Sequence, residues 1–302
     1  MDQKAVDNLV SGVIVVDKPV GLTSHDVVQI IRKGTNIRRA GHTGTLDPRA
    51  SGVLVVLLGP AVRLSEYVSA SDKRYQATIR LGSSTDTYDS EGAMQGEEMP
   101  VDVTEEKFLE ILKSFEGEKE QVPPPYSAVH VDGKRAYELA RQGEEVELEP
   151  RMINVYSLDL LEWAPPEVVI DVYCSSGTYV RSLAHDLGQL LGCGAHLIGL
   201  RRTKSGQFTL RDATSLRRLR DSFDSGDWAQ FLIPAAEALG DWKTIVVGGE
   251  LLETVRHGHR FPNEDGSTGW ARAISEQGDL VALLEADEET KEWQPKKVFF
   301  TS

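Results

Sequence analysis

The chain has 302 residues, a net charge of −14, and 40% hydrophobic and 26% charged residues. These values are ordinary for a soluble globular protein, and no apolar run is long enough to cross a bilayer as a helix. The length allows one large or two modest domains. The two cysteines lack Cys-x-x-Cys spacing and the N-terminus lacks a signal-peptide pattern. We therefore expect a reduced, cytoplasmic chain without a structural metal.

The negative charge is unevenly distributed along the chain. Residues 86–149 hold 18 acids and 6 bases, whereas residues 201–220 hold 7 bases and 1 acid. A basic segment on an acidic chain is compatible with a polyanion docking on one face. The bases of this segment, called here the basic ribbon, are Arg201, Arg202, Lys204, Arg211, Arg217, Arg218 and Arg220.

Strand and helix patterns alternate at the start of the chain. Residues 12–16 predict a strand. Thr23 followed by Asp26 predicts a capping box for a helix that ends at Gly34. The β-branched apolar run 53–58 predicts a buried strand.

The next segments pass from sheet to a polar loop. Residues 61–68 predict a short helix, and the period-two alternation of residues 73–81 predicts a strand with Tyr75 on its apolar face. Core packing and stacking on a base are both open for Tyr75. Residues 82–100 predict a long loop, and residues 104–115 predict an amphipathic helix.

The second half of the chain is richer in strands. Arg181 falls in the first turn of a helix that we expect Thr178 to cap. An arginine there opposes the helix dipole, so it either meets an anion or is an ordinary surface residue. The other predicted strands and helices are the strand 127–131, the helix 134–141, the hairpin of 155–163 with 168–174, the strand 195–200, and a β-rich tail with strands near 244–249, 270–274, 280–284 and 296–300 and a helix at 250–256.

The loop at residues 38–52 is the leading candidate for a functional site. Asp47 is its only acid and is surrounded by glycines and arginines. Glycines permit close approach of a ligand, and arginines suit a phosphate. An Asp-Pro turn that feeds a strand is the structural alternative, because Pro48 restricts Asp47 to extended or turn geometry. Lys18, beside a rigid turn at Pro19, is either a surface lysine or a brace for this loop.

Several catalytic motifs are absent. The chain has no phosphate-binding Gly-x-x-x-x-Gly-Lys-Ser/Thr loop, no His-Glu-x-x-His and no serine nucleophile elbow, and its one partial dinucleotide fingerprint lacks the third glycine. The sequence therefore offers a carboxylate without a metal or cofactor, together with aromatics and a basic surface.

Several short motifs follow one another along the chain: Asp17-Lys18-Pro19, the run from Gly41 to Leu54, Lys73-Arg74-Tyr75, Thr85 to Asp89, Pro124 to Ala128, Gly177 to Leu183 and Leu200 to Gly206. In order and spacing they coincide with the motifs of one family, and the chain resembles the TruB family of tRNA pseudouridine synthases from end to end. Its tail resembles the small PUA-like domain of bacterial members. Ser176 departs from the basic residue expected in many relatives, which leaves one phosphate contact unassigned.

The resemblance implies an α+β fold with a mixed, largely antiparallel central sheet flanked by helices and loops. It implies a catalytic domain over residues 1–240, with an acidic insertion-like segment at 83–150, and a β-rich, PUA-like RNA-binding domain over residues 241–302.

The implied activity is isomerisation of uridine-55 in the tRNA T loop to pseudouridine. The base flips out, a carboxylate assists cleavage of the N1–C1′ bond, and the uracil reattaches through C5. By resemblance Asp47 is the catalytic carboxylate, Arg181 is its ion-pair partner and Tyr75 stacks on the uracil. The other implied contacts are His42, Tyr179 and Leu200 to the substrate, and Lys18, Arg201, Arg202 and Lys204 to RNA. The implied partner is the tRNA T-arm, with no metal, cofactor, membrane or obligatory protein partner, and the chain is expected to be a monomer.

Three alternatives stay open. The chain is a catalytically inactive RNA-binding module, or a member of the guide-RNA-dependent branch of the same family, or a glycoside hydrolase whose second carboxylate is not evident. The acidic 83–150 segment and the short tail favour the stand-alone bacterial type over the guide-dependent one. Whether the carboxylate attacks C1′ or removes the 2′ proton is also open.

Overall fold

The computed structural model describes residues 10–127, 129–131, 134–136, 139 and 148–299. The chain forms two compact units. Unit 1 comprises residues up to Pro48, Val53–Ser69 and the chain from Gln207 on, and unit 2 comprises Arg49–Gly52 and Ala70–Gly206.

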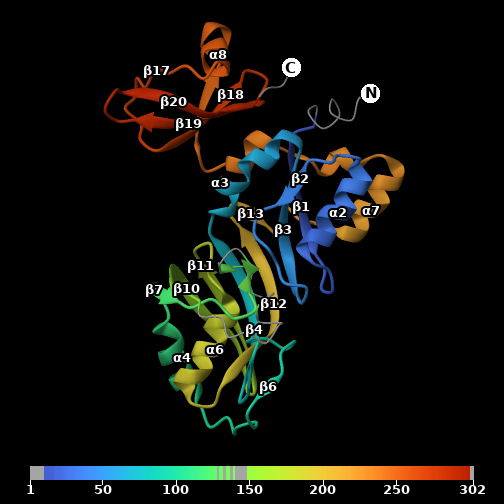
Figure 1. Ribbon diagram of the computed structural model, residues 1–302, viewed down its shortest axis with the longest axis vertical. Helices are drawn as coiled ribbons and strands as arrows, with labels where there is room; N and C mark the ends of the chain where they lie inside the picture. Colours follow the sequence, from blue (N-terminus) through green and yellow to red (C-terminus); the bar gives the residue numbers. More distant parts are fainter. Residues whose placement is uncertain (1–9, 128, 132–133, 137–138, 140–147, 300–302) are drawn as a thin grey trace. The chain divides into compact units, whose positions relative to one another are not determined.

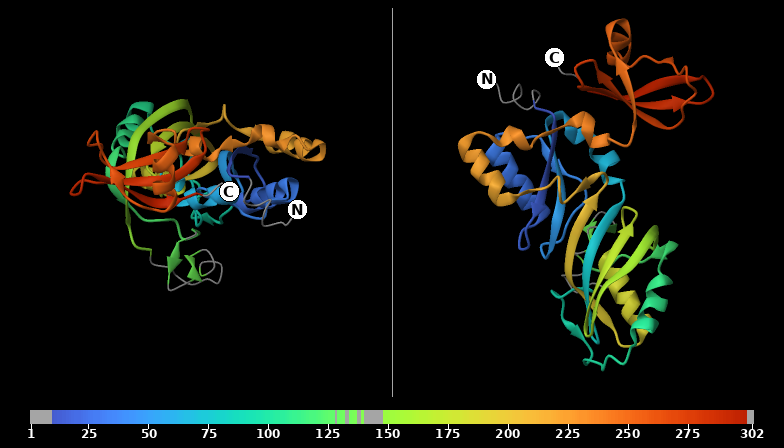
Figure 2. Two further views of the ribbon diagram at one scale, coloured as in Figure 1. Left: turned by 90° about the horizontal axis from the view of Figure 1, so that it is seen from above. Right: turned by 180° about the vertical axis from the view of Figure 1, so that it is seen from behind.

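Unit 1 begins with a buried strand and an amphipathic helix. Strand β1 pairs in parallel with β14 and antiparallel with β15, and β2 pairs antiparallel with β3. Helix α2 lies beside α7, both next to β1 in the views of Figures 1 and 2, and a β-carbon at Gly34 would overlap the ring of Phe223. The elements are β1 (Gly12–Lys18), α2 (Ser24–Thr35), β2 (Ala40–His42), β3 (Ala50–Leu58), η1 (Gly59–Leu64), α3 (Ser65–Ser69), β13 (Phe208–Thr209), β14 (Thr214–Ser215), α7 (Leu216–Ser225), η2 (Trp228–Phe231), β15 (Ile233–Pro234) and η3 (Ala235–Leu239).

The tail of unit 1 forms a separate five-stranded sheet in the order β16-β18-β19-β20-β17. Its own core includes Val247, Val255 and Trp293, and it also packs on η1 and α3, where Leu283 joins a buried cluster with Leu64. The elements are β16 (Lys243–Val247), α8 (Gly249–Arg256), β17 (Phe261–Pro262), β18 (Trp270–Ser275), β19 (Leu280–Asp287) and β20 (Glu292–Val298). The β-rich tail is therefore confirmed, whereas its PUA-like character and the boundary at 240 stay predictions.

Unit 2 is built on an antiparallel sheet in the order β12-β4-β11-β10-β7. Residues Ala50–Gly52 of β3 add to β12 in parallel, so the predicted mixed, largely antiparallel sheet is confirmed. Helices α4 and α6 pack together against this sheet (Figure 1). The elements are β4 (Lys73–Leu81), β5 (Ser84–Thr85), β6 (Met94–Gln95), α4 (Glu105–Lys113), β7 (Gly117–Gln121), β8 (His130–Val131), β9 (Lys134–Arg135), β10 (Arg151–Ala164), β11 (Glu167–Cys174), α6 (Val180–Leu191) and β12 (Ala195–Ser205).

Most predicted elements are present, with local corrections. The capping box of α2 is confirmed, but the helix runs through Gly34 and ends at Asn36, which adopts the left-handed conformation (φ 57°). The predicted loop 82–100 contains the small β5/β6 pair. The predicted helix 134–141 begins instead as strand β9, and most of its remainder lies outside the described residues.

Candidate active site

The residues on both sides of Asp47 are tied to the start of unit 1. The Leu46 amide donates to Ser24 Oγ at 2.8 Å, and Ser24 Oγ donates to the Leu46 carbonyl at 3.1 Å. The carbonyl of Pro48 accepts from the Gly21 amide at 2.8 Å. Because both neighbours are fixed, the backbone of half-buried Asp47 is held in place.

Lys18 is the brace of this loop. Its side chain has 0% exposure, and its Nζ donates to the carbonyls of Pro19 (3.0 Å), Leu22 (2.5 Å) and Pro48 (3.4 Å). A buried ammonium needs such partners, because leaving water without them is costly. The predicted contact of Lys18 with RNA stays a prediction.

The register of unit 2 aligns three strands near the end of the Asp47 loop. Leu200 of β12 lies opposite Ala50 of β3 on one side and Ala77 of β4 on the other. Ala50 follows Asp47 by three residues. Neighbouring strands are about 4.8 Å apart, so Ala50 and Ala77 lie roughly 10 Å apart across Leu200. Predicted residue Leu200 is thus at the centre of this group.

Tyr75 sits two residues before Ala77 on β4 and is 8% exposed. It lies opposite Val172 on β11 and Arg202 on β12. The alternation along β4 is as predicted, with Tyr75, Ala77 and every second residue buried. Its predicted role in stacking on the base stays a prediction.

The arginines and lysine of β12 do not share one environment. Arg202 is 1% exposed, so its guanidinium belongs to the interior of unit 2, and its predicted RNA contact stays a prediction. Arg201 is half-buried with Nη1 3.4 Å from Ser51 Oγ, and Lys204 is half-buried with Nζ 5.8 Å from the Tyr173 ring centre. Only these two keep partial exposure among the β12 residues predicted to bind RNA.

Gly52 explains part of the glycine content of the Asp47 loop. It has φ 100°, and a β-carbon there would overlap the carbonyl oxygen of Arg202. The glycine therefore serves the close β3/β12 pairing, which corrects the interpretation that it makes room for a ligand.

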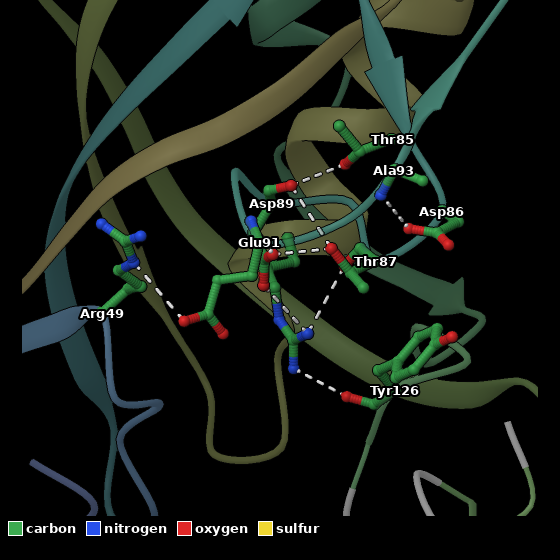
Figure 3. Close-up of polar contacts among 9 residues, drawn as sticks. Arg49, Thr85, Asp86, Thr87, Asp89, Glu91, Ala93 and Tyr126 are labelled. Carbon is green, nitrogen blue, oxygen red and sulfur yellow. Dashed lines mark hydrogen bonds and ion pairs between the residues drawn. The ribbon is translucent and has the colours of Figure 1, made fainter. Parts of the chain in front are cut away.

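Arg181 is the second residue of α6 and is 8% exposed. Its Nη1 lies 3.2 Å from Asp89 Oδ2 and 3.4 Å from the Thr87 carbonyl, and its Nη2 donates to the Tyr126 carbonyl at 3.0 Å. Figure 3 shows this group of contacts. Of the two alternatives left open for Arg181, the structure shows contact with an anion, and this anion is Asp89, which is not among the predicted site residues.

Asp89 accepts several hydrogen bonds within the loop at residues 85–91 (Figure 3). Its Oδ1 accepts from Thr87 Oγ1 at 2.6 Å and from the Glu91 amide at 3.0 Å, and its carbonyl accepts from Thr85 Oγ1 at 2.7 Å. The polar run from Thr85 to Asp89 was the available sequence signal, since such side chains close turns on their own backbone.

A second contact ties this loop to α6. The rings of Tyr88 and His185 stack with centroids 3.8 Å apart and 15° between planes. Burial raises the pKa of Tyr88 and lowers the pKa of His185, and both shifts favour the uncharged ring. Tyr88 adopts a left-handed backbone (φ 63°), which is uncommon for an aromatic residue.

Tyr179 is the N-cap of α6, and the predicted cap by Thr178 is wrong. No side chain caps the helix, but Gln121 of β7 holds the N-cap residue itself: its Oε1 accepts from the Tyr179 amide at 2.8 Å, and its Nε2 donates to the Tyr179 carbonyl at 3.0 Å. The Arg151 guanidinium lies 5.5 Å from the Tyr179 ring centre. Gln121 thus fixes the backbone that leads into Arg181.

The predicted site residues divide between the two units. His42, half-buried opposite Val56, lies in unit 1 with Asp47, whereas Tyr75, Tyr179, Arg181 and Leu200 lie in unit 2. The pairing of Asp47 with Arg181 stays a prediction.

None of the helices in the described residues is long and apolar enough to span a membrane. No group of three or more His, Cys, Asp or Glu in that part of the chain could hold a metal ion. Both cysteines are free and buried, and burial raises the pKa of Cys174 to about 12.

Two family models match most of the chain. Residues 32–180 match the TruB family pseudouridylate synthase N-terminal domain, and residues 181–239 match the tRNA pseudouridylate synthase B C-terminal domain.

Curated relatives and solved structures agree with these models. The chain is 49% identical to tRNA pseudouridine synthase B of Symbiobacterium thermophilum over 82% of each chain, and 42% identical to that of Solibacter usitatus over 91% of this chain and 95% of the relative. A Cbf5-Nop10-Gar1 complex matches 99% of this chain and 88% of that one, with a TM-score of 0.76 and 30% identity. Two matching family models and relatives at this identity lead to one conclusion: the chain belongs to the TruB family of pseudouridylate synthases, which are isomerases that act on uridine in tRNA.

Proposed function

We propose that this protein isomerises uridine-55 in the T loop of tRNA to pseudouridine, with Asp47 as the catalytic carboxylate. The observation that carries the proposal is the register that aligns Ala50, Leu200 and Ala77, because it brings the end of the Asp47 loop and the strand of Tyr75 to the same part of the unit 2 sheet. Tyr75 stacks on the flipped uracil, and Leu200, His42 and Tyr179 contact the nucleotide.

The reaction needs one ionised carboxylate. Cleavage of N1–C1′ develops positive charge on the ribose, and a carboxylate either captures C1′ or removes the 2′ proton. The uracil anion is retained and rotates, and its C5 forms the new bond to C1′ as the carboxylate–C1′ bond breaks or a proton returns to C2′. The C5 proton is then lost, and N1 takes up a proton. Both routes use Asp47 as a carboxylate, and a guanidinium beside it offsets its negative charge.

In this proposal Arg181 supplies the guanidinium. It is already held by Asp89 and by two backbone carbonyls, so its direction does not depend on the substrate. A pre-oriented cation loses little side-chain entropy when the reaction develops charge beside it.

The test uses a T-arm minihelix that carries tritium at uracil C5. The wild type should release tritium, and Asp47→Asn should abolish release, with a loss of at least about a thousandfold in kcat. Asp102→Asn, at an exposed acid of unit 2, is the matched control and should match the wild type. Release by Asp47→Asn at the wild-type rate would refute the mechanism.

The guide-RNA-dependent activity is the second candidate, favoured by the structural likeness to a Cbf5 complex. We infer instead a monomer that acts in the cytoplasm on free tRNA without a protein partner. Tritium release from the naked minihelix by the purified chain supports this choice, and release only after other proteins are added contradicts it.

The proposed RNA contacts are phosphate contacts from the exposed part of the basic ribbon and from the PUA-like tail. Arg217, Arg218 and Arg220 are exposed on α7, and Arg201 and Lys204 are partly exposed on β12. Replacing the three α7 arginines by Gln should weaken tRNA binding and lower the slope of log K against log salt by about 2. An unchanged slope in filter-binding titrations would remove α7 from the interface.

A further inference from the structure

The loop at residues 85–91 binds two arginines in different ways. Asp89 holds Arg181 in a buried ion pair, with 13% and 9% side-chain exposure. Glu91, two residues on, holds Arg49 at 3.4 Å between Nε and Oε1, with 47% and 64% side-chain exposure (Figure 3). The first pair fixes a residue, whereas the second leaves most of both side chains in solvent.

Arg49 follows Asp47 by two residues. Two residues span at most about 7 Å, so the Cα atom of Arg49 lies within that distance of the Cα of Asp47. Pro48 between them is anchored through its carbonyl to Lys18 and Gly21, so Arg49 leaves a fixed point of the chain. A long flexible cation thus starts beside the predicted catalytic carboxylate.

We propose that Arg49 is a phosphate-binding residue for the RNA, and that Glu91 holds its guanidinium only while RNA is absent. This inference rests on the proposed function. A nucleotide whose C1′ lies at Asp47 carries phosphates on both sides of its ribose, a few bonds away. On binding, Arg49 leaves Glu91 and donates to one of these phosphate oxygens.

The energetics favour this exchange. An exposed, single-contact ion pair contributes almost nothing to stability, so its loss costs little. A phosphate offers more acceptor oxygens than a carboxylate and can accept two N–H groups from one edge of the guanidinium. The contact to Glu91 uses only the Nε atom of Arg49. Glu91 also keeps the guanidinium near the loop, so Arg49 is placed before RNA arrives.

Another ion pair in unit 2 serves as a control. Arg80 Nη2 lies 3.1 Å from Glu98 Oε1, with 36% and 65% side-chain exposure. It is about as exposed as the Arg49–Glu91 pair and belongs to the same unit, but it does not adjoin the Asp47 loop in sequence. A substitution at Glu98 removes the same charge without releasing Arg49.

The experiment measures T-arm RNA affinity by filter binding in the Asp47→Asn background, which prevents turnover. Arg49→Ala should raise Kd about five- to tenfold and lower the salt slope by about 0.8. Glu91→Gln should lower Kd by about two- to fivefold, because it frees the guanidinium. In an Arg49→Ala background Glu91→Gln should change Kd less than twofold, and Glu98→Gln alone should also change it less than twofold.

The decisive result is that Arg49→Ala raises Kd whereas Glu91→Gln lowers it. A pair that is only structural predicts weaker binding from both Arg49→Ala and Glu91→Gln, and that outcome overturns the proposal. Equal gains from Glu91→Gln and Glu98→Gln would also overturn it, because they would reflect general repulsion of RNA by acids. If the wild type binds RNA but releases no tritium, the proposed function fails while the order of affinities still decides the role of Arg49.

Discussion

Two loops, one in each unit, are anchored by charges of opposite sign that are largely buried. The Asp47 loop is held by a cation, Lys18, which donates to backbone carbonyls. The 85–91 loop is held by an anion, Asp89, which accepts from a hydroxyl, a backbone amide and Arg181. Each charge therefore completes the hydrogen bonds of a loop that has little regular structure of its own.

The largest effect is expected from removing the cation Lys18. Lys18→Met keeps much of the side-chain volume but removes the lysine donor from the carbonyls of Pro19 and Leu22, and leaves the Pro48 carbonyl with only the Gly21 amide. We expect a loss of about 3 kcal/mol in the free energy of unfolding. Urea titration measures it, with exposed Lys33→Met as the control at under about 0.5 kcal/mol. Equal stability of the two variants would show that Lys18 is not an anchor.

Removing the anion should cost slightly less. Asp89→Asn keeps an acceptor for Thr87 but leaves the Arg181 guanidinium without its carboxylate inside unit 2. We expect a loss of about 2–3 kcal/mol in the free energy of unfolding. Glu98→Gln, which breaks the exposed pair with Arg80, should cost under about 0.5 kcal/mol. A larger loss of stability from Glu98→Gln than from Asp89→Asn would mean that Asp89 is not the acid that anchors the loop.

Lys73 extends the comparison to a buried lysine in unit 2. Burial, with Arg202 nearby, lowers its pKa from 10.5 to about 8, although Ser71 Oγ accepts from its Nζ at 3.1 Å. Between pH 8 and 10.5 the unfolded chain therefore binds more protons at Lys73 than the folded chain. Stability from this residue rises with pH through that window, on the order of 2 kcal/mol.

The measurement is urea unfolding of the wild type and Lys73→Met from pH 7.5 to 10.5. The free energy of unfolding of the wild type, taken relative to that of Lys73→Met, should increase as pH rises. A constant difference across the window would mean that Lys73 keeps its proton in the folded protein.

The smallest effect concerns the aromatic contact that joins the 85–91 loop to α6. In a double-mutant cycle of Tyr88→Ala and His185→Ala we expect a coupling of about 1 kcal/mol, the usual value for a stacked pair. Strictly additive losses would indicate that the two rings pack independently.

Local signals in the sequence were reliable where the partner is local. The capping box of Thr23 and Asp26 lies within one helical turn, and the structure contains it. The predicted cap of α6 by Thr178 is wrong, because the N-cap is the next residue, Tyr179, whose backbone is held by Gln121, 58 residues earlier in the chain. Gly34 was expected to end α2, but its place is explained by the ring of Phe223 on another helix.

The candidate site shows the same division. The motifs predict Tyr75, Arg181 and Leu200 as site residues, but they do not match Asp89 to Arg181, because the two are 92 residues apart. The basic ribbon is continuous in sequence, yet its members lie on β12 and α7, and Arg202 is in the interior.

Most of the long strands, most of the helices and the family follow from the sequence, because periodicity, caps and ordered motifs are properties of neighbouring residues. Only the tertiary structure decided which charges are buried and which are exposed. A strand pattern tells which side chains share a face, but the elements packed on that face decide whether Lys18 and Arg202 meet solvent.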